Sequence, residues 1–221
     1  MMLDKIKGAI FDMDGTLVDS LGLWDLMWED FGKRYLGVDG FHPSAEDDKA
    51  VRTMTLKDAM EMIHKLYGLA ESGEALTQAA HEYIRDYYKT TVQLKPGVLE
   101  FLEACQSRGI KMCIASANGP KLLQTAVACC KLDGFFPKTF SCAAIGKGKD
   151  EPDIYLMAQE YLGTSTEETC VFEDSAVAIE TAHKIGMKTV AIYDRYNYGQ
   201  EQMKATADEY IADGETLMRI V

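Results

Sequence analysis

Five short β-rich runs alternate with helix-patterned segments along this chain of 221 residues, and this alternation constrains its fold more than any other feature. The runs are IKGAIFDMD (6–14), IKMCIASA (110–117), KTFSCAA (138–144), TCVFED (169–174) and KTVAIY (188–193). Between the later runs, apolar residues recur at helical spacing, as they do from Leu122 to Cys130. Strands that alternate with helices predict right-handed crossovers and a parallel sheet covered on both faces. The predicted fold class is therefore α/β, with a doubly wound parallel sheet.

The stretch from about residue 17 to 93 breaks this alternation, because no convincing strand pattern occurs in it. Its apolar residues follow helical spacing instead, as in the stripe Trp24, Met27, Trp28, Phe31 and Tyr35. Similar stripes occur at 56–67 and 76–87. We therefore expect a sheet domain formed by residues 1–16 and 94–221 and an inserted all-helical domain at 17–93.

The charge balance limits the class of partner. Asp and Glu total 35 against 23 Lys and Arg, which gives a formal net charge of −12 and disfavours nucleic acid and anionic membranes. No apolar run approaches the roughly 20 residues of a membrane span, and the first residues lack the pattern of a signal peptide. We expect a cytoplasmic protein that acts on a small molecule, as a monomer or a weak homodimer.

Polar side chains follow the carboxyl ends of three predicted strands, and two lysines precede a predicted helix. These residues are Asp12 and Asp14, Ser116 and Asn118, Glu173 and Asp174, and Lys147 and Lys149. The carboxyl ends of parallel strands meet at one edge of the sheet, where α/β proteins bind their ligands. We therefore expect these side chains to converge on one site.

The four carboxylates among these residues bring four negative charges into a small volume. Two like charges about 4 Å apart cost ~4 kcal/mol at an effective dielectric constant of 20, so such a cluster must take up protons or bind a cation. Oxygen ligands without His or Cys nearby favour a hard divalent ion, and Mg²⁺ combines a few carboxylates with water and phosphate. The sequence thus predicts a Mg²⁺ site for phosphoryl transfer, with a lysine to hold the phosphate.

Four segments, in this order, resemble the four motifs of the haloacid dehalogenase superfamily. They are DMDGT after an apolar strand, a strand-end serine, a lysine before PD, and a strand-end ED, and they span residues 12 to 174. The segment FDMDGTLVDS (11–20) is the most specific of them. The resemblance implies a Rossmann-like doubly wound core with a helical cap, here 17–93, inserted after the first strand. It also implies a Mg²⁺-dependent enzyme.

The resemblance assigns roles to the acidic residues of the first and last motifs. Asp12 resembles the nucleophile and a metal ligand. Asp14 resembles the general acid/base, with its backbone carbonyl on the metal. Asp174 resembles the later metal ligand, and Glu173 is expected to join the metal site through a bound water.

The middle motifs supply the groups that hold phosphate and substrate. Ser116 resembles the phosphate-binding serine, although a serine here also suits the N-cap of the next helix. The family's lysine stands four residues before the aspartate of K-P-x-P-D, which selects Lys149, although Asp150 replaces the proline that follows the lysine. Asn118 and Trp24 are further candidates for substrate binding.

The expected activity is that of a phosphatase, which hydrolyses a small phosphorylated metabolite through an aspartyl-phosphate on Asp12. The alternative is a phosphomutase resembling β-phosphoglucomutase. In such enzymes a histidine stands ten residues beyond the acid/base aspartate, and the corresponding residue here is Trp24, which cannot relay a proton. A dehalogenase would lack the metal chemistry that Asp14 and Asp174 imply. A regulatory phosphate-binding module would not need Asp14 as a proton donor.

Overall fold

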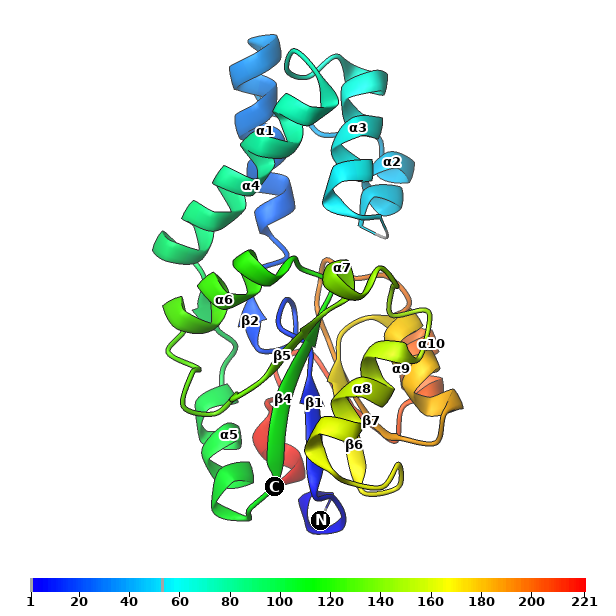
Figure 1. Ribbon diagram of the computed structural model, residues 1–221. Helices are drawn as coiled ribbons and strands as arrows, with labels where there is room; N and C mark the ends of the chain where they lie inside the picture. The colour runs from blue at the N-terminus through cyan, green and yellow to red at the C-terminus, as the bar shows by residue number, and fades with distance from the viewer. Residues whose placement is uncertain (1, 53) are drawn as a thin grey trace. The chain divides into compact units, whose positions relative to one another are not determined.

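The computed structural model describes residues 2–52 and 54–221, which fall into two compact units (Figure 1). The sheet unit comprises Met1–Leu21 and Val92–Val221, and the helical unit comprises Gly22–Thr91. The sequence places the boundaries at 16/17 and 93/94, whereas the contacts place them at 21/22 and 91/92. The reason is a short ribbon in which β2 (Val18–Asp19) pairs antiparallel with β3 (Gln93–Leu94), so that both segments belong to the sheet unit. The expectation that 17–93 holds no strand is wrong for this ribbon.

Six strands form one parallel sheet in the sheet unit, in the order β5–β4–β1–β6–β7–β8. Their bounds are β1 Gly8–Phe11, β4 Lys111–Ser116, β5 Thr139–Ser141, β6 Thr169–Glu173, β7 Lys188–Ile192 and β8 Glu209–Ile211. The chain begins at β1, moves outward through β4 to β5, and then continues on the other side of β1 with β6. The strand order therefore reverses at β1, and such a reversal is where α/β sheets bind ligands. The predicted α/β fold with a doubly wound parallel sheet is confirmed.

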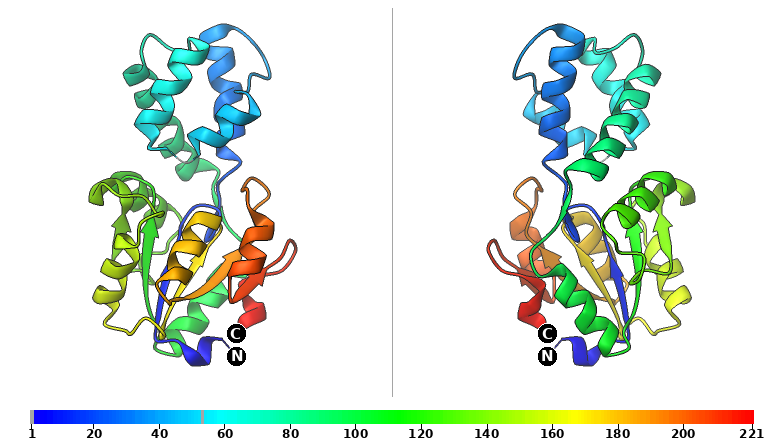
Figure 2. Two further views of the ribbon diagram at one scale, coloured as in Figure 1. Left: turned by 90° about the vertical axis from the view of Figure 1, so that its right-hand side faces the viewer. Right: turned by 90° about the vertical axis from the view of Figure 1, so that its left-hand side faces the viewer.

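Helices cover both faces of this sheet (Figure 2). They are α5 Val98–Ser107, α6 Pro120–Cys129, α7 Cys142–Ile145, α8 Asp153–Leu162, α9 Ala176–Lys184 and α10 Gln200–Thr206, with short 3₁₀ turns at Leu3–Lys5 and Leu217–Ile220. Residues of α8 and α9 pack against the face that carries Ile10 and Val171. On the opposite face, Phe101 of α5 meets Phe11 and Phe172 edge-on, and these two rings stack with 4.4 Å between centroids. This stack fixes β1 against β6 directly below the residues that follow both strands.

Two short elements differ from the sequence-based expectation. The run at 138–144 is only partly a strand, because β5 ends at Ser141 and α7 begins at Cys142. The Ser141 hydroxyl caps this helix by accepting a hydrogen bond from the Ala144 N–H at 3.3 Å. The sequence does not predict strand β8, since its three residues are too few to show an alternating pattern.

The helical unit is built from α1 Leu23–Phe31, the π-helical segment Gly32–Leu36, α2 Ala45–Val51, α3 Leu56–Tyr67 and α4 Gly73–Thr90. The hydroxyls of Ser44, Thr55 and Ser72 cap the N-termini of α2, α3 and α4. The predicted apolar stripes supply its core, which includes Met27, Trp28, Phe31, Met60, Ile63, Leu76, Ala79 and Ala80. The described residues between Gly22 and Thr91 form only helices, turns and loops.

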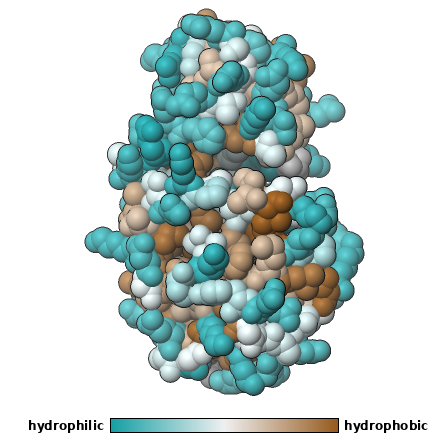
Figure 3. Space-filling view, viewed as in Figure 1, coloured by the Kyte–Doolittle hydropathy of each residue, from teal (hydrophilic) through white to brown (hydrophobic). Residues whose placement is uncertain are grey.

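The surface is that of an ordinary globular protein. Hydrophilic side chains cover much of the face in Figure 3, and hydrophobic ones occur in separate places. Large apolar side chains such as Leu156 and Met157 of α8 are exposed, which is common on folded proteins. In the described part of the chain, no helix has both the length and the apolar character needed to cross a membrane.

Candidate active site

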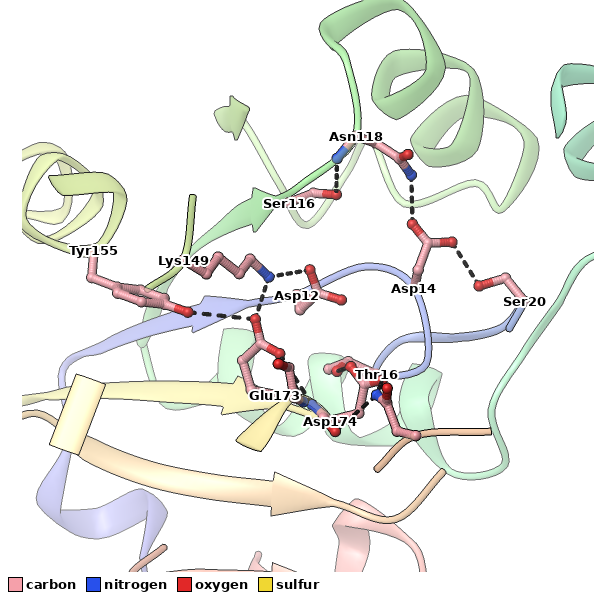
Figure 4. Close-up of polar contacts among 12 residues, drawn as sticks. Asp12, Asp14, Thr16, Ser20, Ser116, Asn118, Lys149, Tyr155, Glu173 and Asp174 are labelled. Atoms are coloured by element: carbon pink, nitrogen blue, oxygen red, sulfur yellow. Dashed lines mark hydrogen bonds and ion pairs between the residues drawn. The ribbon is translucent and has the colours of Figure 1, made fainter. Parts of the chain in front are cut away.

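The polar residues that follow β1, β4 and β6 come together at one edge of the sheet (Figure 4). Strand β1 ends at Phe11 and is followed by Asp12 and Asp14, while β4 ends at Ser116 and β6 at Glu173. The register pairs Phe11 with both Ile114 of β4 and Phe172 of β6. Because these strands are neighbours in register, the residues at their carboxyl ends, and those that follow, lie near one another at this edge of the sheet.

Three carboxylates form the buried centre of this site. Asp12, Glu173 and Asp174 are 7%, 1% and 3% exposed, and each offers a carboxylate oxygen within 4.8 Å of the other two. Burial, together with the charge of Asp12, raises the pKa of Glu173 to about 7. Burial, Asp12 and Glu173 also raise the pKa of Asp174 well above its usual value. The cluster therefore carries unfavourable negative charge that a cation would offset.

Lys149 supplies one positive charge to this cluster. Its ammonium group donates hydrogen bonds to the carboxylates of both Asp12 and Glu173. Burial lowers the pKa of Lys149, but the adjacent Asp12 and Glu173 outweigh burial and hold that pKa well above its usual value. The other lysine of the segment, Lys147, is bound instead to Glu151 and Asp153 at 2.9 Å each. Of the two candidate lysines, the geometry thus brings Lys149 into the site and leaves Lys147 outside it.

Asp14 lies beside the three buried carboxylates and is held from two directions. The Ser20 hydroxyl donates to its Oδ1 at 2.6 Å, and the Asn118 amide donates to its Oδ2 at 2.6 Å. Asn118 in turn is fixed by Ser141, whose hydroxyl donates to the Asn118 carbonyl at 2.6 Å. These bonds set the orientation of a carboxyl group that is only partly buried.

Ser116 lies at the end of β4 with 1% of its surface exposed, and its hydroxyl oxygen accepts the Asn118 N–H at 3.1 Å. The alternative role considered above, that of N-cap for the next helix, belongs to Gly119, which has no capping side chain. The Ser116 hydroxyl oxygen therefore shapes the turn above β4, and a hydroxyl that accepts one hydrogen bond can still donate another.

Gly15 has no side chain, and this lets the Asp174 carboxylate of the last motif lie close to its backbone. Its φ of +78° lies in the left-handed region, and a Cβ built there would lie 2.2 Å from Oδ2 of Asp174. The next residue, Thr16, donates from Oγ1 to Oδ1 of Asp174 at 2.8 Å. The contact of this loop with Asp174 thus explains why glycine and threonine follow Asp14 in the first motif.

The family model for haloacid dehalogenase-like hydrolases matches residues 9–192 of the chain. The chain belongs to this family. It is 24% identical over 217 residues to a phosphorylated carbohydrates phosphatase of Thermotoga maritima, covering 96% of this chain and 97% of the relative. It is 27% identical to hexitol phosphatase A of Escherichia coli (85% and 83% covered) and to the beta-phosphoglucomutase of Bacillus subtilis (92% and 88% covered). The expected family is confirmed, and this hydrolase has both phosphatases and a phosphomutase among its relatives.

Solved structures share the fold of this family member. A putative beta-phosphoglucomutase from Thermotoga maritima superimposes with a TM-score of 0.77 at 23% identity, covering 93% of this chain and 94% of the other. A predicted phosphoglycolate phosphatase from Haemophilus somnus gives 0.79 at 20% identity, with 98% of each chain covered. At these identities the likeness establishes the fold alone.

One predicted site residue of this hydrolase lies in the helical unit. Trp24 is on α1, half-buried, with its ring 5.6 Å from that of Trp28 and the Arg52 guanidinium 6.0 Å from its centroid. Its assignment to the substrate pocket stays a prediction.

Several residues that contact the site were not singled out from the sequence. Thr16 belongs to DMDGT and Ser20 ends the segment FDMDGTLVDS, so their place in that segment is a usable signal. Tyr155, whose hydroxyl lies 3.5 Å from Glu173, and Asn197, which binds Asp174, lie outside the matched motifs. No pattern in the sequence marks either one.

The raised pKa values set the sign of a pH effect on stability in the absence of a bound cation. The pKa of Glu173 is 4.5 for an unperturbed glutamate and about 7 in the fold, so the folded chain binds more protons between these pH values. With a chelator present, we expect the free energy of unfolding to fall as pH rises through this window, by up to about 1.4 kcal/mol per pH unit for Glu173. Urea unfolding at pH 5 and pH 7 measures the fall.

Glu173→Gln should make this fall smaller, because the variant removes one of the titrating groups. The exposed Glu167→Gln serves as the matched control and should keep the wild-type dependence. Equal pH dependence in the wild type and in Glu173→Gln would contradict the assignment.

Proposed function

We propose that this hydrolase is a Mg²⁺-dependent phosphatase that acts on a small phosphorylated metabolite through an aspartyl-phosphate on Asp12. The single observation that carries the proposal is the buried cluster of Asp12, Glu173 and Asp174 with Lys149 at its side. A carboxylate cluster with one ammonium group attracts a hard cation and, with that cation, a phosphate group.

The donor set of the cluster suits Mg²⁺. The three groups offer only carboxylate oxygens, which hard divalent ions prefer, and burial disfavours the charges of Glu173 and Asp174 unless a cation is present. Asp12, Asp174 and Glu173 would hold the ion, with the backbone carbonyl of Asp14 as a further ligand. When bound, the ion neutralises charge that develops on the phosphoryl oxygens.

In the proposed reaction, the protein's own side chains form the bond to phosphorus and transfer the protons. The Asp12 carboxylate attacks phosphorus and the bond to the leaving oxygen breaks, while Asp14 gives that oxygen its proton. The ionised Asp14 then takes a proton from water, whose oxygen attacks phosphorus, releases inorganic phosphate and frees Asp12. Lys149 and Ser116 hold phosphoryl oxygens during both steps.

The relatives support a sugar phosphate or a similar small metabolite as the substrate. Two of them are named as phosphatases of phosphorylated carbohydrates and of hexitols, and they match most of this chain. We further propose that the helical unit Gly22–Thr91 acts as the cap that selects the substrate, with Trp24 among the residues that contact it. In many enzymes such a cover also excludes water from the reacting groups.

The phosphatase test begins with the nucleophile. Asp12→Asn keeps the size of the side chain but removes its nucleophilic charge, so we expect turnover of phosphate esters to fall at least about a thousandfold. A panel of sugar phosphates with Mg²⁺ and detection of inorganic phosphate measures it. The exposed Asp133→Asn is the control and should keep wild-type turnover. An Asp12→Asn enzyme with more than about one per cent of wild-type activity would exclude Asp12 as the nucleophile.

Removal of the metal tests whether the reaction requires Mg²⁺. We expect no phosphate release in excess chelator, full recovery with Mg²⁺, and inhibition by Ca²⁺. The larger Ca²⁺ takes more oxygen ligands at longer distances. It would bind both oxygens of Asp12, and neither oxygen would then be placed for in-line attack on phosphorus. Undiminished activity in chelator, with circular dichroism showing an unchanged fold, is the outcome that excludes a metal-dependent reaction.

A second candidate function, phosphomutase, is favoured by the relative named beta-phosphoglucomutase. A mutase must keep water from its aspartyl-phosphate until a sugar phosphate arrives, and Trp24 stands where such enzymes have a proton-relaying histidine. We therefore expect phosphate release without isomerisation when β-glucose 1-phosphate is offered with a trace of the 1,6-bisphosphate. Assays for glucose 6-phosphate and inorganic phosphate distinguish the two reactions. Rapid isomerisation with negligible phosphate release would establish the mutase.

A further inference from the structure

Asn197 lies in the loop between β7 and α10, far along the chain from the residues of the four motifs, yet its side chain contacts Asp174. The Asn197 amide nitrogen donates to the backbone carbonyl of Asp174 at 2.9 Å and also to Oδ2 of the Asp174 carboxylate. An amide nitrogen has two hydrogens to donate, and here both are directed to one residue.

The Asp174 carboxylate is consequently held from both sides. Thr16 donates to Oδ1 at 2.8 Å, while Asn197 donates to Oδ2. A carboxylate offers about four acceptor positions on its two oxygens, so two hydrogen bonds fix its plane and leave positions for a cation. Hydrogen bonds of this kind orient metal ligands and adjust their affinity for the metal.

The loop that carries Asn197 is fastened by its own contacts. The carbonyl of Asp194 accepts the Asn197 N–H at 3.1 Å, and the Gln200 side chain donates to the carbonyls of Asp194 and Asn197 at 2.9 and 3.2 Å. The Asp194 carboxylate, 3% exposed, pairs with Lys95 at 2.8 Å and accepts the Tyr196 N–H at 2.9 Å. Since these bonds form without the Asn197 side chain, that side chain is not what shapes the loop.

We infer that Asn197 is a positioning residue for the cation site, and the inference rests on the proposed function. It holds the Asp174 carboxylate in the orientation that a metal ligand needs, from a loop that is preorganised by Asp194 and Gln200. Its loss frees one side of Asp174 to rotate, and the affinity for Mg²⁺ falls while the fold remains.

Calorimetric titration of the substrate-free chain with Mg²⁺ tests this role. We expect Asn197→Ala and the similarly sized Asn197→Leu to raise the Kd for Mg²⁺ about tenfold or more, as the loss of a partner to a metal ligand commonly does. In the phosphatase assay, the Mg²⁺ concentration for half-maximal rate should rise by a similar factor, with kcat restored at saturating Mg²⁺. Gln202→Ala in α10, which removes an exposed hydrogen bond to Glu180 of α9, should leave both values unchanged.

The outcomes separate this role from the proposed function. A wild-type chain that binds no Mg²⁺ would overturn both the metal site and the role of Asn197. Wild-type binding with an unchanged Kd in both Asn197 variants would overturn only the role of Asn197. A lower Tm in chelator together with an unchanged Kd would overturn it as well, because it would mean that Asn197 merely stabilises the loop.

Discussion

The burial of three carboxylates at one edge of the sheet is the constraint on which the rest of the site depends. Asp12, Glu173 and Asp174 are each less than a tenth exposed, and their oxygens lie within 4.8 Å of one another. Like charges at such distances are costly in a protein interior, so each must be matched by a cation, a proton or a hydrogen-bond donor. The surrounding groups follow from this requirement: Lys149 faces two of the carboxylates, and Thr16 and Asn197 face the third.

The sheet satisfies this constraint by its strand order. Since β1 lies between β4 and β6, residues that are over a hundred positions apart in the sequence follow adjacent strands in register. The stacked rings of Phe11 and Phe172 lie one residue before Asp12 and Glu173, so apolar packing directly supports the charged layer. The apolar core around these rings thus holds the charged groups in place, although it takes no part in the chemistry.

The fold and the centre of the site were predictable because both leave local patterns in the sequence. Alternating strands and helices gave the parallel sheet, and DMDGT, the strand-end serine and FEDS marked Asp12, Asp14, Ser116, Glu173 and Asp174. The supporting residues leave no such pattern. Asn197 reaches Asp174 only because β7 lies beside β6, and Tyr155 reaches Glu173 only because α8 packs over the sheet. The ribbon of β2 and β3 was missed for a related reason, since two residues per strand cannot show a period.

Relatives of this hydrolase are named as phosphatases and as a phosphomutase, so membership of the family alone does not choose between the two reactions. In the mechanism proposed above, water accepts the phosphoryl group from Asp12, whereas in a phosphomutase a sugar hydroxyl would accept it. The choice must therefore lie with the groups that orient the acceptor and its proton. In this chain Asp14, the proposed acid/base, accepts hydrogen bonds from Ser20 and Asn118, which are both in the sheet unit. Ser20 and Asn118 orient the carboxylate that would take the proton from the acceptor, and they are therefore groups on which the choice can depend.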